Sequence, residues 1–220
     1  MRVILGLLLL AVSMPAWAQE APTTPAPATA PAASEEPPIT FHKGQFGLSA
    51  RLGLGVRGIA TYKNTIWCGA TDPEGEFMNF ASVCTGRTPF TIDFEAAYGV
   101  ANSIELTLEL RVGIERDLGG TPTAQGPFPL RLAPGARFFF SEAKRSKLFV
   151  QPELVFDFTD YKDYSNVSRG NDFGVRALEG FWLDLHRAYG VYIWIAESAE
   201  VLRWLSFTFE GGLGFQGRYP

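Results

Sequence analysis

Arginine, aspartate and glutamate recur at every second position in several stretches of this chain. Residues 104–116 read IELTLELRVGIER, with Glu105, Glu109, Arg111 and Glu115 at odd positions and leucine, isoleucine and valine at even ones. At this spacing the charged groups lie on one face of an extended strand. Their natural chemistry is ion pairing, because a planar guanidinium can bond both oxygens of a carboxylate.

These residues do not suggest catalysis. The two histidines, His42 and His186, lie outside the expected strands, and we interpret both as exposed turn residues. No serine, histidine and acid are arranged to act together on a lipid-accessible outer face, as a lipid hydrolase would require. We therefore expect no enzyme, no bound cofactor and no metal site.

Alternation of apolar and polar residues predicts the elements that carry these charges. We expect eight β-strands, at residues 45–60, 89–100, 104–116, 130–140, 148–158, 172–185, 191–199 and 204–219. The connections between them alternate in length. The long ones cover about 61–87, 117–127 and 160–171, and short turns lie near 101–103, 142–146 and 186–189. This rhythm is typical of an antiparallel up-and-down β-barrel.

Two barrel types fit such strands, and they differ in which face meets water. In a soluble, lipocalin-like barrel the apolar face is the core, whereas in a transmembrane barrel it faces lipid. The polar faces combine charges with glycine, serine, threonine and alanine, which suits a narrow lumen. Every lysine falls in an expected loop or turn, while the strand cations are arginines. The apolar faces are rich in leucine and phenylalanine, with aromatics towards the strand ends. This pattern favours the transmembrane barrel.

The polar faces should then form an ion-pair network inside the barrel. The expected members are Arg51, Arg57, Asp93, Glu95, Glu105, Glu109, Arg111, Glu115, Arg131, Arg137, Glu153, Asp157, Arg176, Asp184, Glu197 and Glu210. Hairpin geometry predicts that Arg131 lies opposite Asp157 and that Asp93 lies opposite Arg111. The acids outnumber the arginines, so we expect some of them to be hydrated or near the rims.

Three strand residues do not fit the scheme. Glu179 falls on the apolar face of its strand, which indicates either a β-bulge or a position at the rim. Pro134 and Pro152 lie within neighbouring strands, and proline cannot donate to the hydrogen-bond ladder. We expect a local bulge or a weak patch at these prolines.

The segment before the barrel has two parts. Residues 1–18 combine one arginine, an apolar run and Ala16-Trp17-Ala18, which is typical of a secretory signal peptide; an N-terminal membrane anchor is the alternative. Residues 19–40 are rich in proline and alanine and should be a disordered spacer. The barrel domain is expected at residues 41–220.

The chain has two cysteines, Cys68 and Cys84, within one long connection. In an exported chain, two cysteines predict a disulfide bond. The net charge of −4 is modest, and no basic patch indicates binding to nucleic acid.

On the signal peptide, the strand count, the alternation and an aromatic-rich last strand, FTFEGGLGF followed by Tyr219, the chain resembles the small eight-stranded outer-membrane barrels, such as the OmpA transmembrane domain, OmpX and OmpW. It ends in Tyr-Pro, where such proteins frequently end in phenylalanine. The resemblance implies a monomer in the lipid of a Gram-negative outer membrane, with both termini periplasmic. It implies roles that range from membrane integrity and adhesion to narrow, porin-like pores and lipid-modifying enzymes.

We expect a structural or surface-interaction protein that acts, in the manner of an adhesin, through its extracellular loops. Exposed aromatic residues often mark contact sites, and the loop candidates for an extracellular ligand or surface partner are Trp67, Phe77, Phe80, Tyr161 and Tyr164. The alternative for these residues is packing over the barrel mouth. The alternative function is a narrow, cation-preferring channel for small solutes, which the acidic excess would favour.

Overall fold

The computed structural model describes residues 42–60, 69–71, 77–80, 83–117, 127–140, 144–161, 170–186 and 188–219. Its strands are β1 (Phe46–Ala60), β2 (Gly69–Thr71), β3 (Phe77–Phe80), β4 (Val83–Arg87), β5 (Thr91–Ala101), β6 (Ile104–Gly113), β7 (Leu130–Phe140), β8 (Ser146–Asp157), β9 (Asp172–His186), β10 (Tyr189–Glu200) and β11 (Leu205–Tyr219). Within these ranges no helix is long and apolar enough to cross a bilayer.

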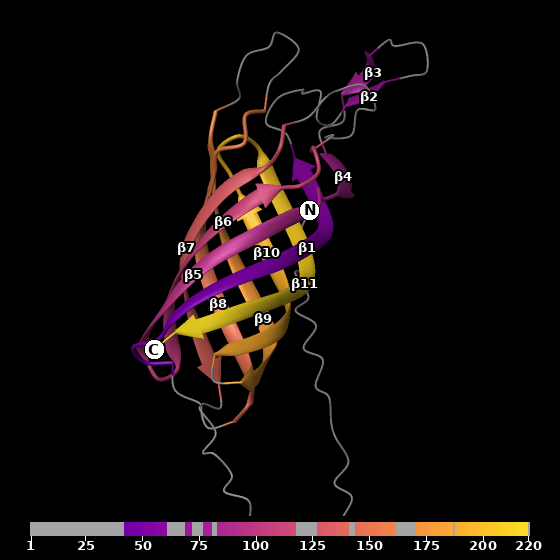
Figure 1. The fold of residues 1–220 in the computed structure, drawn as a ribbon. Coiled ribbons are helices and arrows are strands. Elements are labelled where there is room, and N and C mark those ends of the chain that lie inside the picture. The colour runs from indigo at the N-terminus through magenta and orange to yellow at the C-terminus, as the bar shows by residue number, and fades with distance from the viewer. Residues whose placement is uncertain are drawn as a thin grey trace, which may run out of the picture. The chain divides into compact units, whose positions relative to one another are not determined.

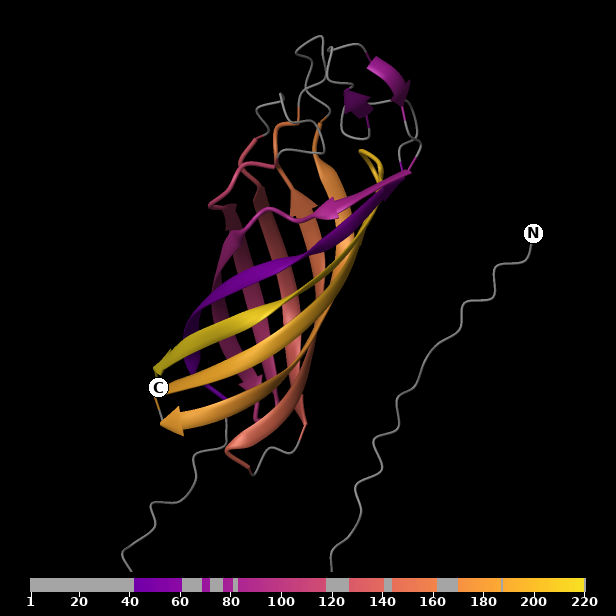
Figure 2. The ribbon, with the colours of Figure 1, turned by 90° about the vertical axis from the view of Figure 1, so that its right-hand side faces the viewer.

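Eight long strands form a closed antiparallel barrel. Each strand pairs with the next along the chain in the order β1, β5, β6, β7, β8, β9, β10, β11. The ring closes because β11 pairs with β1 along their whole lengths, from Phe46 opposite Tyr219 to Ala60 opposite Leu205. The strands run obliquely around the barrel axis (Figure 1; Figure 2). The predicted all-β, eight-stranded up-and-down barrel is confirmed.

The wall is inside-out relative to a soluble barrel. In β6, Leu108 is 48% exposed on the outer face, while its neighbour Glu109 is 1% exposed inside. The same alternation holds in the other barrel strands, whose exposed positions are largely leucine, isoleucine, valine and phenylalanine. The lipocalin-like alternative, which needs an apolar interior, is therefore wrong.

One end of the wall is irregular. β4 pairs with the far part of β1, and β5 pairs with the near part. Pro89 lies in the break between them, where the Thr88 amide donates to the Gly55 carbonyl over 2.9 Å. β6 ends at Gly113, where a Cβ atom would lie 2.2 Å from the ring of Pro129. Beyond Gly113 the backbone pairing continues irregularly, because the Ile114 and Glu115 amides both donate to the Phe90 carbonyl and the Asp117 amide donates to the Pro127 carbonyl.

Pro134 and Pro152 interrupt the β7–β8 ladder without shifting its register. Arg131 lies opposite Asp157 and Phe138 opposite Val150, and both pairs belong to one continuous register. That register places Pro134 beside Leu154 and Pro152 beside Ala136, and neither of these two pairs forms in the ladder. The expected bulge is absent between these two described strands, and the expected weak patch is a gap where two amide donors are missing.

We expect Pro152→Ala to stabilise the barrel, because an alanine amide can donate across the gap to β7. One added hydrogen bond contributes about 1 kcal/mol to the free energy of unfolding. Urea unfolding in lipid vesicles, followed by tryptophan fluorescence, measures the change. Pro129→Ala is the control, because it removes a proline outside the gap. An equal gain in both variants would contradict the explanation.

Candidate functional site inside the barrel

The predicted charged residues gather in the lumen. Twelve of the sixteen expected members of the network are buried: Arg51, Asp93, Glu95, Glu105, Glu109, Arg111, Arg137, Glu153, Asp157, Arg176, Asp184 and Glu210. Arg57 and Arg131 are half-buried near the end of the barrel that carries the long connections, and the other two, Glu115 and Glu197, lie outside the lumen. The predicted pairings of Arg131 with Asp157 and of Asp93 with Arg111 match the observed register.

Arg111 bridges two carboxylates inside the barrel. Its Nε and Nη2 atoms donate to the two oxygens of Asp93 over 2.7 and 2.9 Å, and its Nη1 atom donates to Glu210 over 2.6 Å. The first contact joins adjacent strands, and the second crosses from β6 to β11. One guanidinium thus links opposite parts of the wall.

Three carboxylates approach one another beside it. Oxygen atoms of Glu95, Glu109 and Glu153 lie within 4.8 Å of one another, a spacing that could hold a cation. Arginines already surround them: Arg51 and Arg176 both contact Glu109, and Arg176 Nε donates to Glu153 over 2.6 Å. The positive charge at this cluster therefore comes from guanidinium groups of the chain itself.

Arg137 organises the half of the lumen nearer the short turns. It donates to Glu95 over 2.5 Å, to Glu105 over 3.0 Å and to Gln151 over 2.7 Å. Its guanidinium carbon lies 5.3 Å from the ring centres of Phe149 and Trp182. Carboxylates on one side and aromatic faces on the other therefore both stabilise the charge.

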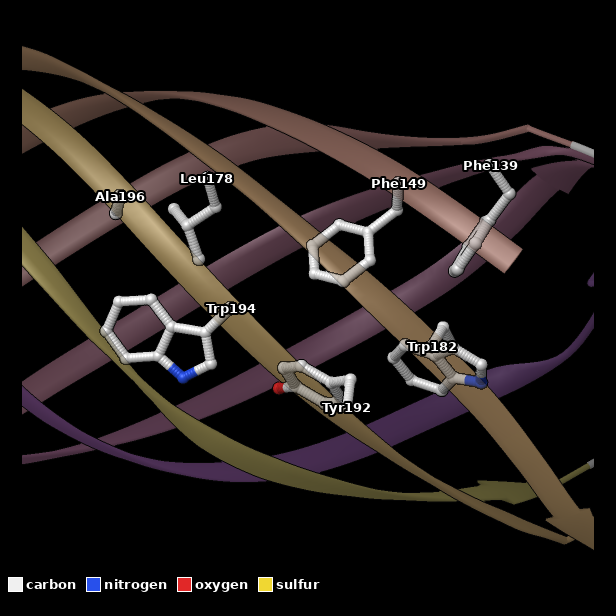
Figure 3. Close-up of a cluster of buried hydrophobic side chains, with 7 residues drawn as sticks. All are labelled: Phe139, Phe149, Leu178, Trp182, Tyr192, Trp194 and Ala196. Atoms are coloured by element: carbon white, nitrogen blue, oxygen red, sulfur yellow. The ribbon is translucent and has the colours of Figure 1, made fainter. Parts of the chain in front are cut away.

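An aromatic cluster fills the rest of this half (Figure 3). The rings of Trp182 and Tyr192 stack with centres 4.7 Å apart and planes at 9°. Glycine makes room for them, because a Cβ atom at Gly214 would lie 2.2 Å from the Tyr192 ring. We did not predict this cluster. Its one signal was that residues 191–199 are apolar on both faces, which places Tyr192 and Trp194 inside.

At the short-turn end, His42 closes the lumen. We expected an exposed turn residue, but His42 is 1% exposed. Its Nδ1 atom contacts Glu105, its Nε2 atom lies 2.8 Å from Lys147 Nζ, and its ring lies 4.2 Å from that of Phe139. The chain before β1 turns at Gly44, whose φ of +80° suits glycine, and this turn folds His42 across the opening. His186, in contrast, is exposed at the end of β9.

Lys147 also corrects an expectation, because it lies in β8 and not in a loop. It is buried, and its Nζ lies 2.8 Å from Asp184. Arg218 donates to the other oxygen of Asp184 over 2.7 Å. Asp184, which we expected inside, is therefore shared by two cations at this end.

These contacts define the protonation of His42. Burial lowers its pKa, and the nearby cations Arg218 and Lys147 act in the same direction, whereas Glu105 opposes them. The neutral ring suits both neighbours, since Nδ1–H donates to Glu105 while Nε2 accepts from the Lys147 ammonium. A proton on Nε2 would place an N–H donor against the Lys147 ammonium, which is also a donor.

The opposite end is closed by a second group. Arg57 donates to both oxygens of Asp117 over 2.5 Å, and the Tyr161 hydroxyl donates to the same carboxylate. The Arg203 guanidinium lies 4.4 Å from the Tyr161 ring centre and 5.3 Å from that of Trp204. Tyr161, expected as an exposed loop contact, is 2% exposed and packs over the barrel mouth.

Three acidic residues lie elsewhere than expected. Glu115 lies beyond the end of β6 and bonds Arg87 over 2.5 Å in an ion pair that is exposed to solvent. Glu197 points outward from β10 and is exposed. Glu179, expected in a bulge or at a rim, occupies a regular position half-way along β9 with its side chain outward. Glu115 and Glu197 are therefore absent from the interior, whereas Asp117, Asp172 and Glu200, which we did not expect there, are buried.

Several predicted residues lie outside the described part of the chain. They are Cys68, Trp67 and Tyr164. Phe77 and Phe80 lie in β3 and Cys84 lies in β4, but the structure does not describe their side chains. The disulfide and these loop contacts therefore stay predictions.

The lumen leaves little free volume near the long-connection end. A cavity between Arg57, Arg111, Asp117, Arg131 and Glu210 measures about 10 Å³. This volume is about enough for one water molecule. The arrangement can hold charges rigidly in place, but it offers no wide path for a solute at this level.

Comparison with known proteins identifies the fold. No protein-family model and no curated protein matches the sequence. Among solved structures, the chain is similar to the N-terminal β-barrel domain of Pseudomonas aeruginosa OprF, with a TM-score of 0.52 and 10% identity over 80% of this chain and 98% of that one. It is equally similar to Neisserial surface protein A, with a TM-score of 0.52 and 11% identity over 80% and 100%. The chain thus has the fold of the small eight-stranded outer-membrane barrels.

Arg137→Met should destabilise the barrel strongly, because Glu95 and Glu105 would keep buried charges without this partner. Breaking a buried pair from one side costs about 3–5 kcal/mol of unfolding free energy. Arg87→Met is the control, since it removes an equally short ion pair that is exposed to solvent. Urea unfolding measures both variants, and equal losses would contradict the assigned role of the interior pairs.

Stability should also depend on pH through His42. Because the folded-state pKa lies below the unfolded value of about 6.5, unfolding takes up a proton, and stability rises with pH up to that value. We expect wild-type protein to lose more stability than His42→Asn as the pH falls from about 7 to 5. Unfolding midpoints across this range measure the difference, and parallel curves would contradict a buried neutral imidazole.

Proposed function

We propose that the protein is a sealed outer-membrane barrel that presents its long connections to a partner at the cell surface. The observation that supports this proposal is the filled interior. Ion pairs and aromatic rings occupy the lumen from His42 at one end to the Tyr161 and Trp204 group at the other. Because the interior charges pair with one another and fill the lumen, the barrel is suited to anchoring rather than to transport.

The outer face supports the location. Leu108, Ile193 and Leu213 are among many large apolar side chains that the barrel exposes. Such a belt is favourable only against lipid. We propose that the membrane is the outer membrane of a Gram-negative bacterium, reached by means of the signal peptide at residues 1–18. The described ends of the barrel, Phe46 and Tyr219, pair at the short-turn end, which the proposal assigns to the periplasm.

In this proposal, the long connections at the end opposite the short turns contact the surface partner. β4 pairs with the far part of β1 and places the Cys84 backbone opposite Ile59, at the end where the long connections begin. We propose a disulfide between Cys84 and Cys68 that limits the first connection, and partner contacts through Trp67, Phe77, Phe80 and Tyr164. Tyr161 is left out because it is buried with Asp117 and Trp204. The proposal includes no enzymatic activity.

The channel alternative is less well supported. It rested on an acidic excess in the lumen, and this excess is smaller than expected because Glu115 and Glu197 lie outside it. Three further acids are buried, and three further cations match them in number: Asp117, Asp172 and Glu200 against Lys147, Arg203 and Arg218. Most of the described interior acids contact arginine, lysine or histidine, as Glu109 and Glu210 do. Asp172 is different, because it accepts from the backbone amides of Phe173 and Leu202. A cation in transit would have to displace these guanidinium groups.

Planar-bilayer recording separates the two functions. We expect wild-type protein to give no conductance steps above background, because the interior pairs block ion passage. A large water-filled porin inserted under the same conditions is the positive control. A cation-selective conductance that Glu109→Gln reduces would contradict the sealed barrel and favour the channel. Boiled and unboiled samples that migrate differently on a detergent gel show that the barrel is folded in each trial.

A further inference from the structure

Two carboxylates point outward from the barrel wall at positions that should face lipid. Glu179 is the eighth of the fifteen residues of β9, and its neighbours across the ladders are Val150 and Ile195. Glu197 is exposed on β10. Neither carboxylate has a hydrogen bond or ion pair with any residue that the structure describes. A charged side chain on the lipid face destabilises a barrel most at mid-height, so Glu179 needs a proton or a partner.

The strand tilt brings the two carboxylates into line. Glu197 is two residues beyond Ile195, which pairs with Glu179. Strands in small barrels tilt by roughly 40° to the barrel axis. On strands with this tilt, the step from β9 to β10 moves a residue sideways around the barrel, and two residues along β10 move it back by about the same distance. Glu197 therefore lies above Glu179 along the barrel axis. The two groups define a line on the wall, parallel to the membrane normal.

The wall differs on the two sides of this line. On the β8 side lies a groove of about 730 Å³ that extends to Glu197 on the line and to Phe207 on β11. Pro134, Pro152, Ala177 and Ala199 leave it hollow between the larger side chains of Leu154, Val175 and Phe207. On the β11 side, large apolar side chains project outward, among them Ile195 and Phe209, each 48% exposed.

We propose that this wall is the interface of a parallel homodimer, with a two-fold axis running along the line of Glu179 and Glu197. A two-fold axis places each residue near its own copy and exchanges the two sides of the line. Glu179 of each copy then meets Glu179 of the other. A protonated carboxyl group can donate to its counterpart and accept from it, which satisfies both in lipid.

The same axis makes the shapes complementary. It places Ile195 and Phe209 of each copy against the hollow of the other at the same height in the membrane. The hollow includes Pro134 and Pro152, where the β7–β8 ladder lacks two donors. The second copy would therefore shield the carbonyl groups that this gap leaves without a strand partner.

Other occupants fit the wall less well. The amine of a lipid headgroup stays at the membrane surface, far from the mid-height position of Glu179. The described arginine and lysine residues of the barrel strands point into the lumen, as Arg51, Lys147 and Arg176 do. A second copy thus offers no cation at this height, but it offers an identical carboxyl group. The inference rests on the membrane location proposed above, and it replaces the monomer expected from the resemblance.

Sedimentation equilibrium in density-matched detergent micelles tests the dimer. We expect wild-type protein to dimerise and Glu179→Gln to dimerise similarly, because an amide can also donate and accept. Glu179→Leu should weaken association about tenfold, as expected for loss of a polar pair in a membrane interface. Leu108→Ala on β6, away from this wall, is the control and should leave association unchanged.

A cross-link tests the position of the axis. In lipid vesicles, Glu197→Cys should form a disulfide-linked dimer on oxidation, whereas Leu108→Cys should not. Wild-type protein that stays monomeric at every protein-to-detergent ratio would overturn the proposal. So would unchanged association of Glu179→Leu, or a wild-type monomer with a bound phospholipid that Glu179→Leu loses. If the protein shows no heat-dependent gel mobility and stays soluble without detergent, the membrane location itself fails.

Discussion

The pairing of guanidinium and carboxylate groups across a narrow ring is the interaction on which this structure depends. Eight strands enclose a space only as wide as the side chains that fill it. A charge placed there cannot reach bulk water, so it must meet an opposite charge on another strand. Arg111, Arg137 and Arg176 each bridge carboxylates from more than one strand. Ion pairs between different strands therefore help to hold the ring of strands closed.

The aromatic cluster has a complementary role. Where the lumen holds fewer charges, Trp182, Tyr192 and Phe149 occupy the volume, and Arg137 lies against their faces. Glycine on a facing strand position compensates for their size, as Gly214 does for Tyr192. A large side chain thus lies opposite a small one on the neighbouring strand. The interior is consequently filled both where ion pairs occupy it and where aromatic rings do.

The sequence was informative where a strand alternates strictly between polar and apolar residues; β10, which is apolar on both faces, gave a wrong position for Glu197. A period of two separates inside from outside, and short hairpins determine register, so that the turn between two strands was enough to place Arg131 opposite Asp157. Prediction failed where the chain leaves the strands. His42 and Tyr161 enter the barrel ends through turns that have no periodic pattern, and Lys147 lies at the beginning of a strand. Glu179 violated the pattern visibly, but the pattern alone could not show that it stays in register.

The bond between Arg111 and Glu210 joins residues 99 positions apart in the chain, one on β6 and the other on β11. It cannot form until the last strand has reached its place against the first. Until then the inner face of a curved, open sheet stays hydrated, and its charges have no desolvation cost. Closing the seam between β1 and β11 removes that water and forms the long-range pairs in one step. Assembly should therefore be slow and cooperative, since contacts of such high sequence separation carry a large loop-closure entropy. An incomplete chain that lacks β11 would lack the counter-charge as well as the strand.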